Sequence, residues 1–339
     1  MVPDYTLPGD NRRVVLAARP DGIPVATDFA IVREAVPGVG PGQALVRNLY
    51  LSADPVQRGW ATNPSLQPIG APMRALSVGI VIESRCEGVS AGDLAYGFLG
   101  WQDYAVTTRD ELLSVISRPR APASAYAGVL GMPGVTAWLA LADLAPVRSG
   151  QSVLVSTGAG AVGSVVGQIV AAKGARPVGL TGSDEKVARC MHRYGYAEAH
   201  NYKTADLTAV LAASAPQGYD TYFDNTGGWI ADIALRNMAR QGRIIQCGTA
   251  ATASWSPTPS GLRPEREILT RVLTWSGFYI FDHAARFHDA IDALSDLIDA
   301  GQLTYDEDIE PGFDNIRGAL EALFAGENSG KKLIFIGDD

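Results

Sequence analysis

The hydrophobic and polar positions of this chain follow two different rhythms. From about Val14 to Ile116 the apolar residues come in short runs that glycine and proline interrupt, for example at residues 44–50 and 78–82. Short runs with such breaks are typical of many short strands. From about Ser152 the pattern alternates between strand and helix, which is typical of a parallel sheet with helices on both faces. The chain therefore predicts a β-rich barrel or sandwich followed by a doubly wound α/β domain.

The alternation in the second region can be followed element by element. Residues 153–156 form a β-branched run, and the apolar positions of residues 162–170 then recur at helical spacing until Gly174 offers a C-terminal cap. Ser183 is a candidate N-terminal cap for a helix that runs to about Tyr194. Further strands of the same sheet are predicted at residues 177–180, 219–223 and 243–247.

The end of the chain is less regular. Residues 250–264 are rich in threonine, serine and proline and predict a long loop, and long ordered loops in compact domains are usually functional. Residues 306–339 have strand, helix and strand character. Whether this last segment returns to the N-terminal β domain stays open at this level.

Length and charge narrow the class of protein. A chain of 339 residues predicts two domains with well-formed cores, and 47% hydrophobic with 19% charged residues is an ordinary globular composition. The net charge is −8, and no cluster of lysine and arginine interrupts it. A surface of this kind is not suited to nucleic-acid phosphates or anionic lipid, so the expected partners are small molecules.

The chain carries no mark of export or of a membrane span. Its first residues lack the basic-then-apolar pattern of a secretory signal. The uncharged stretch of residues 121–142 is broken by Pro122 and Pro133, which favours a buried helix or a substrate wall over a membrane span. The three cysteines, at positions 86, 190 and 247, form no C-x-x-C pair, so neither a disulfide framework nor a thiolate zinc cluster is indicated. A cytoplasmic location is expected.

The glycines of the sequence Gly158-x-Gly160-x-x-Gly163 follow a predicted strand and open a predicted helix. In the dinucleotide fingerprint, one such glycine makes the tight turn, the next lets the backbone approach the pyrophosphate, and the third lets the helix pack on the strand. Phosphate then lies at the positive N-terminus of the helix, next to Ala161 and Val162. The alternative is a glycine-rich turn that serves close packing only.

The end of the second predicted strand indicates which dinucleotide is bound. Folds that bind NAD place an acid there for the ribose 2′-hydroxyl, but this strand ends in Thr181, Gly182 and Ser183. The acids that follow stand in the first turn of a helix, where they complement its dipole. Lys186 is within reach of a 2′-phosphate, so NADPH is preferred over NADH. The alternative is that Lys186 is merely a solvated helix residue.

The sequence indicates no metal centre and no hydrolytic nucleophile. A catalytic zinc needs three protein ligands, whereas the four histidines all lie in the C-terminal half and only His283 and His288 are close in sequence. The glycine turn has alanine where a nucleophile elbow needs serine. Metal-free hydride transfer is the chemistry that remains.

Several motifs in the same order over nearly the whole chain resemble the zinc-independent medium-chain dehydrogenase/reductases. Within them the chain looks like the group of leukotriene B4 dehydrogenase, prostaglandin reductase, plant alkenal double-bond reductase and bacterial curcumin reductase. The motifs are residues 49–55 (LYLSADP), 130–138 (LGMPGVTAW), 158–163 (GAGAVG), 182–186 (GSDEK), 201–203 (NYK), 224–228 (DNTGG), 247–248 (CG) and 326–331 (GENSGK).

The resemblance implies a GroES-like β-barrel domain of residues 1–127 and 300–339, a Rossmann NADP(H)-binding domain of residues 128–299, and a homodimer. By matching motif positions, Lys186 and Tyr202 would bind the 2′-phosphate, with Gly182 and Ser183 beside it. Met132 and Thr136 would lie near the nicotinamide. The path of the ribose and nicotinamide would be lined by Asn225, Cys247, Phe278, Ile280 and Asn328.

The chain departs from this family where the substrate is expected. Members commonly have tyrosine directly after the Asp-Pro pair, where this chain has Val56, and a second cleft tyrosine is replaced by Thr270. A third tyrosine of the family aligns with Ala253, near Trp255. The proton or hydrogen bond for a developing enolate is therefore expected from the Thr270 hydroxyl, from Tyr279, from a ribose hydroxyl of the cofactor or from water.

Arginines offer a further contact with the substrate. Arg58 and Arg74 stand close in sequence to the segments expected to face the cleft, and an arginine there is suited to a substrate carboxylate or oxyanion. The alternative is a structural arginine that ties loops together.

Three functions remain open from the sequence. The first is NADPH-dependent reduction of the C=C bond of α,β-unsaturated aldehydes and ketones, without metal. A quinone reductase would use the same cofactor site with a different acceptor. The replacement of both cleft tyrosines leaves a non-catalytic NADPH-binding protein as the third.

Overall fold

The computed structural model describes residues 7–255 and 257–337, which form two compact units. Unit 1 contains the chain up to Gly131 and again from Glu307 onward, and unit 2 runs from Met132 to Asp306. The chain thus passes between the units twice, after Gly131 and after Asp306. The boundaries proposed from the sequence lie after residues 127 and 299.

Unit 2 is built on a parallel sheet with the strand order β10-β9-β8-β11-β12-β13. The chain builds outward from β8 to β10, then returns to the other side of β8 and continues to β13, so the strand order switches between β8 and β11. The strands are β8 (Ser152–Ser156), β9 (Arg176–Thr181), β10 (Glu198–Asn201), β11 (Tyr219–Asp224), β12 (Met238–Gln246) and β13 (Thr274–Gly277).

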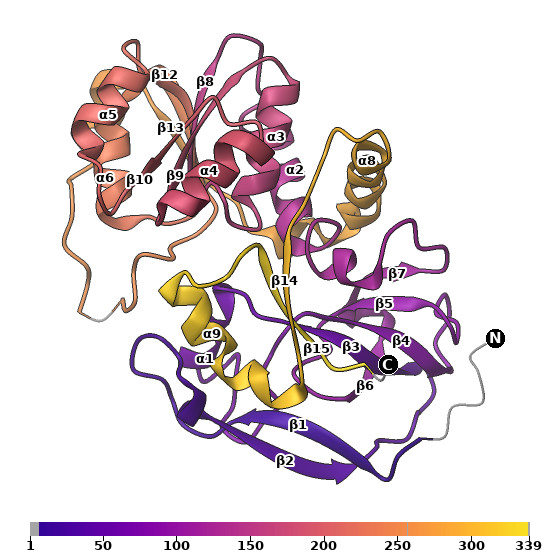
Figure 1. Cartoon of the computed structure of the whole chain (residues 1–339). Coiled ribbons are helices and arrows are strands. Elements are labelled where there is room, and N and C mark those ends of the chain that lie inside the picture. The colour runs from indigo at the N-terminus through magenta and orange to yellow at the C-terminus, as the bar shows by residue number, and fades with distance from the viewer. Residues whose placement is uncertain (1–6, 256, 338–339) are drawn as a thin grey trace. The chain divides into compact units, whose positions relative to one another are not determined.

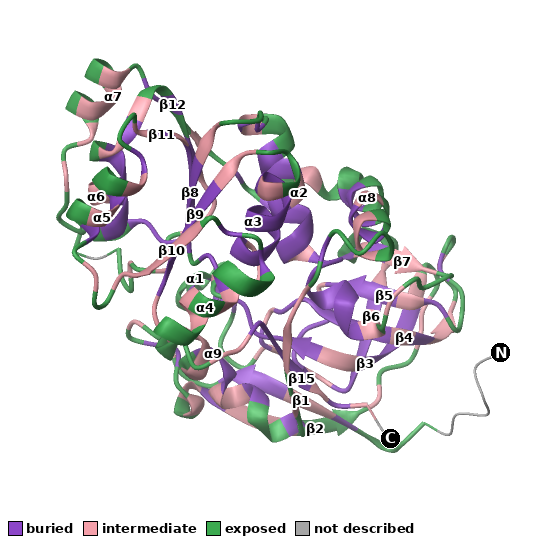
Figure 2. Ribbon diagram, turned by 45° about the horizontal axis from the view of Figure 1, so that its top comes forward, coloured by how far each residue is buried: buried purple, intermediate pink, exposed green. Residues whose placement is uncertain are grey.

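Helices cover both faces of this sheet (Figure 1). On one face, α5 and α6 bury Leu211 and Leu235 against Leu154, Leu180 and other strand residues. On the other face, α3 and α4 pack on β8, β9 and β10. The helices of unit 2 are α2 (Met132–Leu144), α3 (Gly163–Ala172), α4 (Asp184–Arg193), α5 (Leu207–Ser214), α6 (Gly228–Arg236), α7 (Glu265–Arg271) and α8 (Phe287–Asp299). Figure 2 shows the central strands buried and the outer helix faces exposed.

Unit 1 is built on a mixed sheet with the strand order β14-β15-β3-β4-β5-β7, and β6 pairs with β3. β15 is antiparallel to β3, so a strand from the C-terminal segment completes the N-terminal sheet. The strands are β1 (Asp10–Leu16), β2 (Phe29–Ala35), β3 (Gln43–Ser52), β4 (Ser77–Ser84), β5 (Leu94–Gly97), β6 (Tyr104–Thr108), β7 (Leu112–Ile116), β14 (Glu307–Pro311) and β15 (Lys331–Phe335). Its helices are α1 (Val56–Thr62) and α9 (Ile316–Ala325).

The fold class predicted from the sequence is confirmed: a doubly wound parallel sheet accompanies a β domain. The segment from residue 306 does form strand, helix and strand, and it returns to the N-terminal sheet. The described residues of the predicted loop at 250–264 contain neither helix nor strand. Within the described ranges, no helix is long and apolar enough to cross a membrane.

Candidate cofactor-binding and active site

The carboxyl edge of the parallel sheet in unit 2 is where a ligand is expected. In open α/β sheets, ligands bind beyond the carboxyl ends of the strands at the point where the strand order switches, here between β8 and β11. The chain segments that leave these strands are residues 157–163 after β8, 182–183 after β9, 202–203 after β10, 225–228 after β11 and 247–248 after β12.

The glycine turn after β8 has room for backbone only. A Cβ atom on Gly163 would lie 2.2 Å from the carbonyl oxygen of Thr157, and one on Gly160 would lie 2.7 Å from the Thr157 Cγ2 atom. A Cβ on Gly158 would lie 3.2 Å from both the Cys190 Sγ atom and the Gly179 Cα atom. A side chain at Gly163 would therefore clash with the backbone, and one at Gly158 or Gly160 would crowd its neighbours.

The turn leads directly into α3. Thr157 has a φ of +55°, which reverses the chain immediately after the strand. Val162 is the N-cap of α3 and Gly163 its first residue, so the backbone at Ala161, Val162 and Gly163 forms the positive end of a ten-residue helix. This is the arrangement that binds pyrophosphate in dinucleotide folds.

A buried carboxylate holds the adjoining loop in place. Asp224, the last residue of β11, is inaccessible to solvent, and its Oδ1 atom accepts hydrogen bonds from the backbone N–H groups of Thr226 and Gly227, both at 2.8 Å. The Tyr222 hydroxyl donates to the same oxygen at 2.9 Å. Burial, and then the Asp224 carboxylate, raise the pKa of Tyr222 well above its ordinary value, so this phenol remains a donor.

Asn225 is fixed by the end of β8. Its backbone N–H donates to Ser156 Oγ at 2.8 Å, and its side-chain Nδ2 atom donates to the Ser156 carbonyl oxygen at 2.7 Å. The Ser156 hydroxyl in turn donates to Asp224 Oδ1 at 3.2 Å. The two strands at the switch point are thereby joined at their carboxyl ends, with Asn225 beside the glycine turn.

Cys247 follows β12 on the same edge. Its N–H and that of Gly248 donate to the Asp224 carbonyl oxygen at 2.8 and 3.0 Å. The pKa of the Cys247 thiol is raised to about 12 by burial and then by the Asp224 carboxylate. The thiol is therefore neutral at physiological pH and is not an activated nucleophile.

The residues that end β9 and follow it, Thr181, Gly182 and Ser183, carry no carboxylate, and the first acid after them is Asp184 at the start of α4. The Ser183 Oγ atom accepts a hydrogen bond from the Lys186 N–H at 3.3 Å, which confirms Ser183 as the N-cap of α4. A Cβ atom on Gly182 would lie 2.9 Å from the Tyr202 hydroxyl oxygen and 3.5 Å from Lys203 Cε. The structure thus brings Gly182 and Tyr202 together, as predicted for neighbours of a 2′-phosphate.

The acids of α4 have other partners. Asp184 Oδ1 accepts from Asn201 Nδ2 at 2.8 Å, and Glu185 Oε1 accepts from Arg189 at 2.7 Å. Lys203 also lies near Gly182, although its sequence pattern did not predict a place in the site. The only indication in the sequence was its place in the motif Asn201-Tyr202-Lys203. Its distance from Gly182 depends on the pairing of β10 with β9, which the sequence does not show.

These residues fit a dinucleotide with a phosphorylated ribose. The glycines let the turn pack closely on β8 and β9, which leaves backbone N–H groups at the start of α3. Ser183, Lys186, Tyr202 and Lys203 follow the ends of β9 and β10 and bring hydroxyl and ammonium groups. A carboxylate there would accept from a ribose hydroxyl and repel a phosphate, whereas this set donates to a phosphate. The Lys186 and Tyr202 side chains would hold the 2′-phosphate, and the turn at 158–163 the pyrophosphate.

The segment after β13 brings three predicted residues to the same edge. The Phe278 N–H donates to the carbonyl oxygen of Gln246, the last residue of β12, at 3.0 Å. Phe278 and Ile280 are buried, and the Phe278 ring stacks on His283 at 4.7 Å between ring centroids. Tyr279 is 57% exposed. Its ring makes an edge-to-face contact with Phe281 at 5.3 Å between centroids, and its backbone follows Phe278 at the carboxyl edge.

Thr270, in contrast, lies at the amino edge of the sheet. Its carbonyl oxygen accepts from Arg240, near the start of β12, and the next residue, Arg271, donates to the carbonyl oxygen of Met238, where β12 begins. The Thr270 hydroxyl donates to the Arg266 carbonyl oxygen at 2.7 Å, within α7. Thr270 is thus at the opposite end of β12 from Cys247, and this corrects its expected role as a donor in the site.

Two more predicted residues are on α2. Met132 and Thr136 are four residues apart and therefore share one face of the helix. Thr136 is buried, whereas Met132 is half-buried at the first position of unit 2.

The remaining candidates belong to unit 1. Arg58 lies on α1 with its guanidinium 4.5 Å from the centre of the Phe324 ring, and burial lowers its pKa. Arg74 lies 4.0 Å from the centre of the Phe98 ring. Val56 begins α1, and Asn328 precedes β15, with its Nδ2 atom donating to the Gly330 carbonyl oxygen at 2.6 Å. Both arginines therefore stack on aromatic rings within unit 1.

Comparison with known proteins adds the family. A family model described as the N-terminal domain of oxidoreductase matches residues 12–115, and one described as zinc-binding dehydrogenase matches residues 161–296. Across residues 7–255 and 257–337, no three His, Cys, Asp or Glu side chains are grouped so that they could hold a metal ion.

Relatives match over nearly their whole length. A Bacillus subtilis protein, YfmJ, named as an NADP-dependent oxidoreductase, is 39% identical over 97% of this chain and 98% of its own. An NADP(+)-dependent 2-alkenal reductase of Nicotiana tabacum is 34% identical over 96% of this chain and 97% of its own. Prostaglandin reductase 1 of Bos taurus is 37% identical over 92% of this chain and 95% of its own.

A solved structure agrees with these relatives. CurA from Vibrio vulnificus, in complex with NADPH, superposes with a TM-score of 0.89 at 31% identity, covering 97% of this chain and all of that one. The fit of the carboxyl edge to a 2′-phosphate and the NADP-dependence of the relatives lead to the same cofactor, NADPH. The chain belongs to the medium-chain dehydrogenase/reductase family, and it is an NADPH-dependent oxidoreductase of the group that includes the alkenal, curcumin and prostaglandin reductases.

Proposed function

We propose that this oxidoreductase reduces the C=C bond of α,β-unsaturated aldehydes and ketones. The observation that supports NADPH as the reductant is the end of β9, where Gly182 lies against Tyr202, Ser183 caps α4 and Lys186 is in the first turn of that helix. The names of the relatives, which include alkenal and prostaglandin reductases, support this class of acceptor.

Bound NADPH supplies the hydride that adds to the β-carbon of such an acceptor. The chain's own part is to bind and orient. The glycine turn and the N-terminus of α3 would hold the pyrophosphate. The hydrogen bonds of Asp224 and Ser156 fix the loop at Asn225, so the site is organised before its ligands arrive.

The oxyanion that develops on the acceptor needs a hydrogen-bond donor. Thr270 is at the wrong edge of the sheet and has no part in this proposal. Tyr279 is an exposed residue that directly follows Phe278 at the carboxyl edge, which makes it the candidate donor within unit 2. Arg58 is the candidate contact for a carboxylate or oxyanion from unit 1. Removing a donor of this kind typically raises the barrier by roughly 3 kcal/mol.

The test is NADPH and NADH oxidation with an alkenal, an aryl enone and a quinone as acceptors. We expect turnover of the alkenal or the enone with NADPH strongly preferred. In Lys186→Ala the KM for NADPH should rise about tenfold or more, because a charge-assisted hydrogen bond is worth about 1.5–3 kcal/mol, whereas the KM for NADH should hardly change.

Lys173→Ala is the matched control, because Lys173 is an exposed lysine at the far end of α3. Turnover of the quinone alone would replace the proposal by a quinone reductase. Tight binding of NADPH without turnover of any acceptor would favour a non-catalytic NADPH-binding protein.

We also propose that the protein is a homodimer and acts in the cytoplasm. β13 is the outermost strand of its sheet, and Trp275 on it is exposed, as are Leu269 and Val272 just before it. An unprotected edge with exposed apolar side chains is suited to pairing with a second copy. The three cysteines are free thiols, as expected in a reducing compartment.

A further inference from the structure

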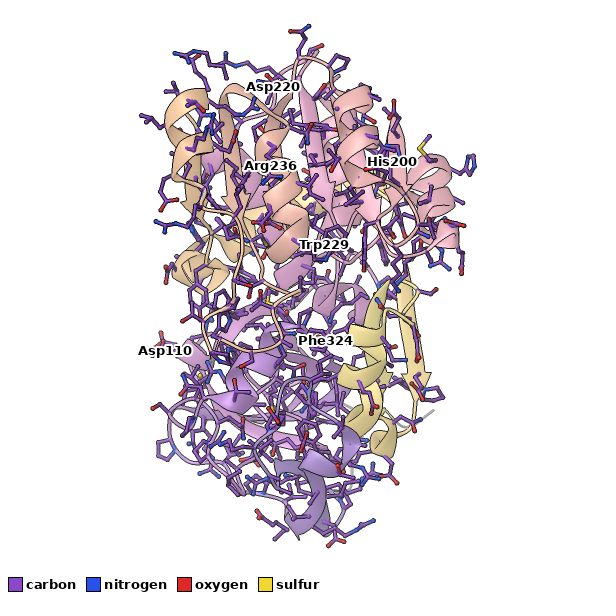
Figure 3. The ribbon with its side chains drawn as sticks, turned by 90° about the vertical axis from the view of Figure 1, so that its left-hand side faces the viewer. Asp110, His200, Asp220, Trp229, Arg236 and Phe324 are labelled. Atoms are coloured by element: carbon purple, nitrogen blue, oxygen red, sulfur yellow. The ribbon has the colours of Figure 1, made fainter. Side chains whose placement is uncertain are left out.

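One large aromatic side chain at the carboxyl edge has no role in the site described so far. Trp229 is the second residue of α6 and is 50% exposed to solvent. Figure 3 shows Trp229 and Arg236 at the two ends of this helix, with Asp220, near the start of β11, at the opposite edge from Trp229. Tryptophan is usually largely buried, so the exposure of Trp229 indicates that it has a function at the surface.

The position of Trp229 is set by the turn before it. Gly227 and Gly228 have φ angles of +66° and +62°, in the left-handed region that glycine adopts without strain. The N–H of Gly227 is held by Asp224 at 2.8 Å, so the start of α6 is anchored to the buried end of β11. Trp229 is therefore presented from a fixed backbone and not from a free loop.

Trp229 also meets the residue predicted to bind the 2′-phosphate. Its ring makes an edge-to-face contact with Tyr202, at 6.1 Å between centroids and 72° between planes. The two residues follow β11 and β10, which are separated in the sheet by β8 and β9, so the contact crosses the carboxyl edge beside the end of β9. The Tyr202 hydroxyl at the other end of that ring lies against Gly182.

The chemistry of the ligand determines what lies next to the phosphate. In NADPH the 2′-phosphate is on the ribose carbon adjacent to the one that carries adenine, so the base must lie within one sugar ring of Gly182 and Tyr202. Adenine is a flat, uncharged heterocycle that stacks on aromatic side chains. Trp229 keeps half of its surface exposed while it contacts Tyr202, so surface of its side chain is accessible to a base.

We propose that Trp229 binds the adenine of NADPH by stacking, with Tyr202 holding the indole in place. This inference rests on the proposed function only through the 2′-phosphate site at the end of β9. It gives the chain an affinity for the adenosine half of the cofactor that does not depend on the nicotinamide or on the acceptor. It also makes Trp229 a reporter of cofactor binding.

The test is the binding of three ligands to the whole protein by calorimetry: NADPH, 2′-phospho-ADP-ribose, which lacks the nicotinamide, and reduced nicotinamide mononucleotide, which lacks adenine. Trp229→Ala should weaken the first two by about tenfold, because stacking of one base contributes roughly 1–3 kcal/mol. Reduced nicotinamide mononucleotide should bind as it does to the wild type. Trp229→Phe should restore most of the loss.

A second readout is intrinsic tryptophan fluorescence on addition of 2′-phospho-ADP-ribose. The change in emission should disappear in Trp229→Phe and persist in Trp275→Phe, the matched control on β13, whose tryptophan is 37% exposed. Equal affinity of Trp229→Ala and wild type for NADPH would overturn the inference and leave the proposed function intact. If the wild type bound NADPH no better than NADH, the 2′-phosphate site itself would be wrong, and the inference with it.

Discussion

At the scale of the residue, the site depends on positions where a single added group, such as a Cβ atom or a carboxylate, would change what can bind. The glycines at 158, 160 and 163 allow contacts that a Cβ atom would crowd, and Thr181 is followed by Gly182 and Ser183 instead of an acid, which we expect to favour the phosphorylated cofactor. Both features can be predicted from the sequence, because the small size of glycine and the negative charge of a carboxylate have the same effect at the end of any strand. The role of Asp224 was not predicted, because its near neighbours Tyr222, Thr226 and Gly227 reach its carboxylate only through the shape of the turn after β11, which the sequence pattern does not show.

Asp224→Asn tests this carboxylate. Its Oδ1 faces two backbone N–H donors and its Oδ2 accepts from Gln246 Nε2 at 3.1 Å, so an amide NH2 group at either place would meet another donor. We expect the free energy of unfolding, measured by urea denaturation, to fall by about 3 kcal/mol, because buried donors lose a charged acceptor. NADPH and NADH should both bind more weakly.

Asp220→Asn is the control on the same strand. Asp220 accepts one hydrogen bond, from the Ser152 N–H at 2.8 Å, at the amino edge of the sheet. It should lose less than about 1 kcal/mol, which is the usual contribution of a single hydrogen bond. Equal losses in the two variants would mean that Asp224 is an ordinary strand-end acceptor.

At the scale of the element, periodicity and caps predicted the parallel sheet well. The strand at 177–180 and the helix capped by Ser183 correspond to β9 and α4. The short helix α1, in the β-rich region, was not predicted, because seven residues give too little periodicity to distinguish it from the loops around it. Thr270 was misplaced for a related reason: alignment with a motif does not reveal to which edge of the sheet α7 leads.

The edge strand β13 provides a prediction at this scale. If two copies pair along it, light scattering should give a mass twice the chain's 35.8 kDa for the wild type. Trp275→Lys should shift the mass toward that of one chain, because a lysine on an exposed edge opposes strand pairing. Met191→Lys, at an exposed residue of α4, should leave the mass unchanged. A wild type that elutes as a single chain would contradict the homodimer.

At the scale of the whole molecule, the chain is divided into two units that it connects twice, and the second connection has adjacent acids. Asp306, the last residue of unit 2, accepts a hydrogen bond from Arg193 at 2.8 Å. Glu307, the first residue of the second part of unit 1, accepts from the Ser124 hydroxyl at 2.9 Å. Burial raises the pKa of Glu307 above its ordinary value of 4.5.

Glu307 therefore makes stability depend on pH. Because its pKa is higher in the folded state, the folded chain binds more protons, and the free energy of unfolding falls as pH rises from 4.5 through the folded pKa. Glu307→Gln keeps an acceptor for Ser124 and removes the charge. We expect the variant to be more stable than wild type at pH 7.5 and to lose this advantage toward pH 4.5.

Urea denaturation at the two pH values measures the difference. The control is Glu87→Gln, which removes an exposed carboxylate of unit 1 and should have little effect at either pH. A Glu307→Gln variant that is less stable than wild type at pH 7.5 would show that the ionised carboxylate is favourable where it lies.

The pairing of β15 with β3 has a consequence for how the protein is made. Synthesis from the N-terminus usually lets the first domain fold first. Here β3 leaves the ribosome before unit 2, but its partner at residues 331–335 emerges only after the whole of unit 2. The uninterrupted segment from Met132 to Asp306 has all its strands well before then. A nascent or truncated chain therefore holds a finished nucleotide-binding unit beside an open apolar sheet edge, the form most exposed to aggregation.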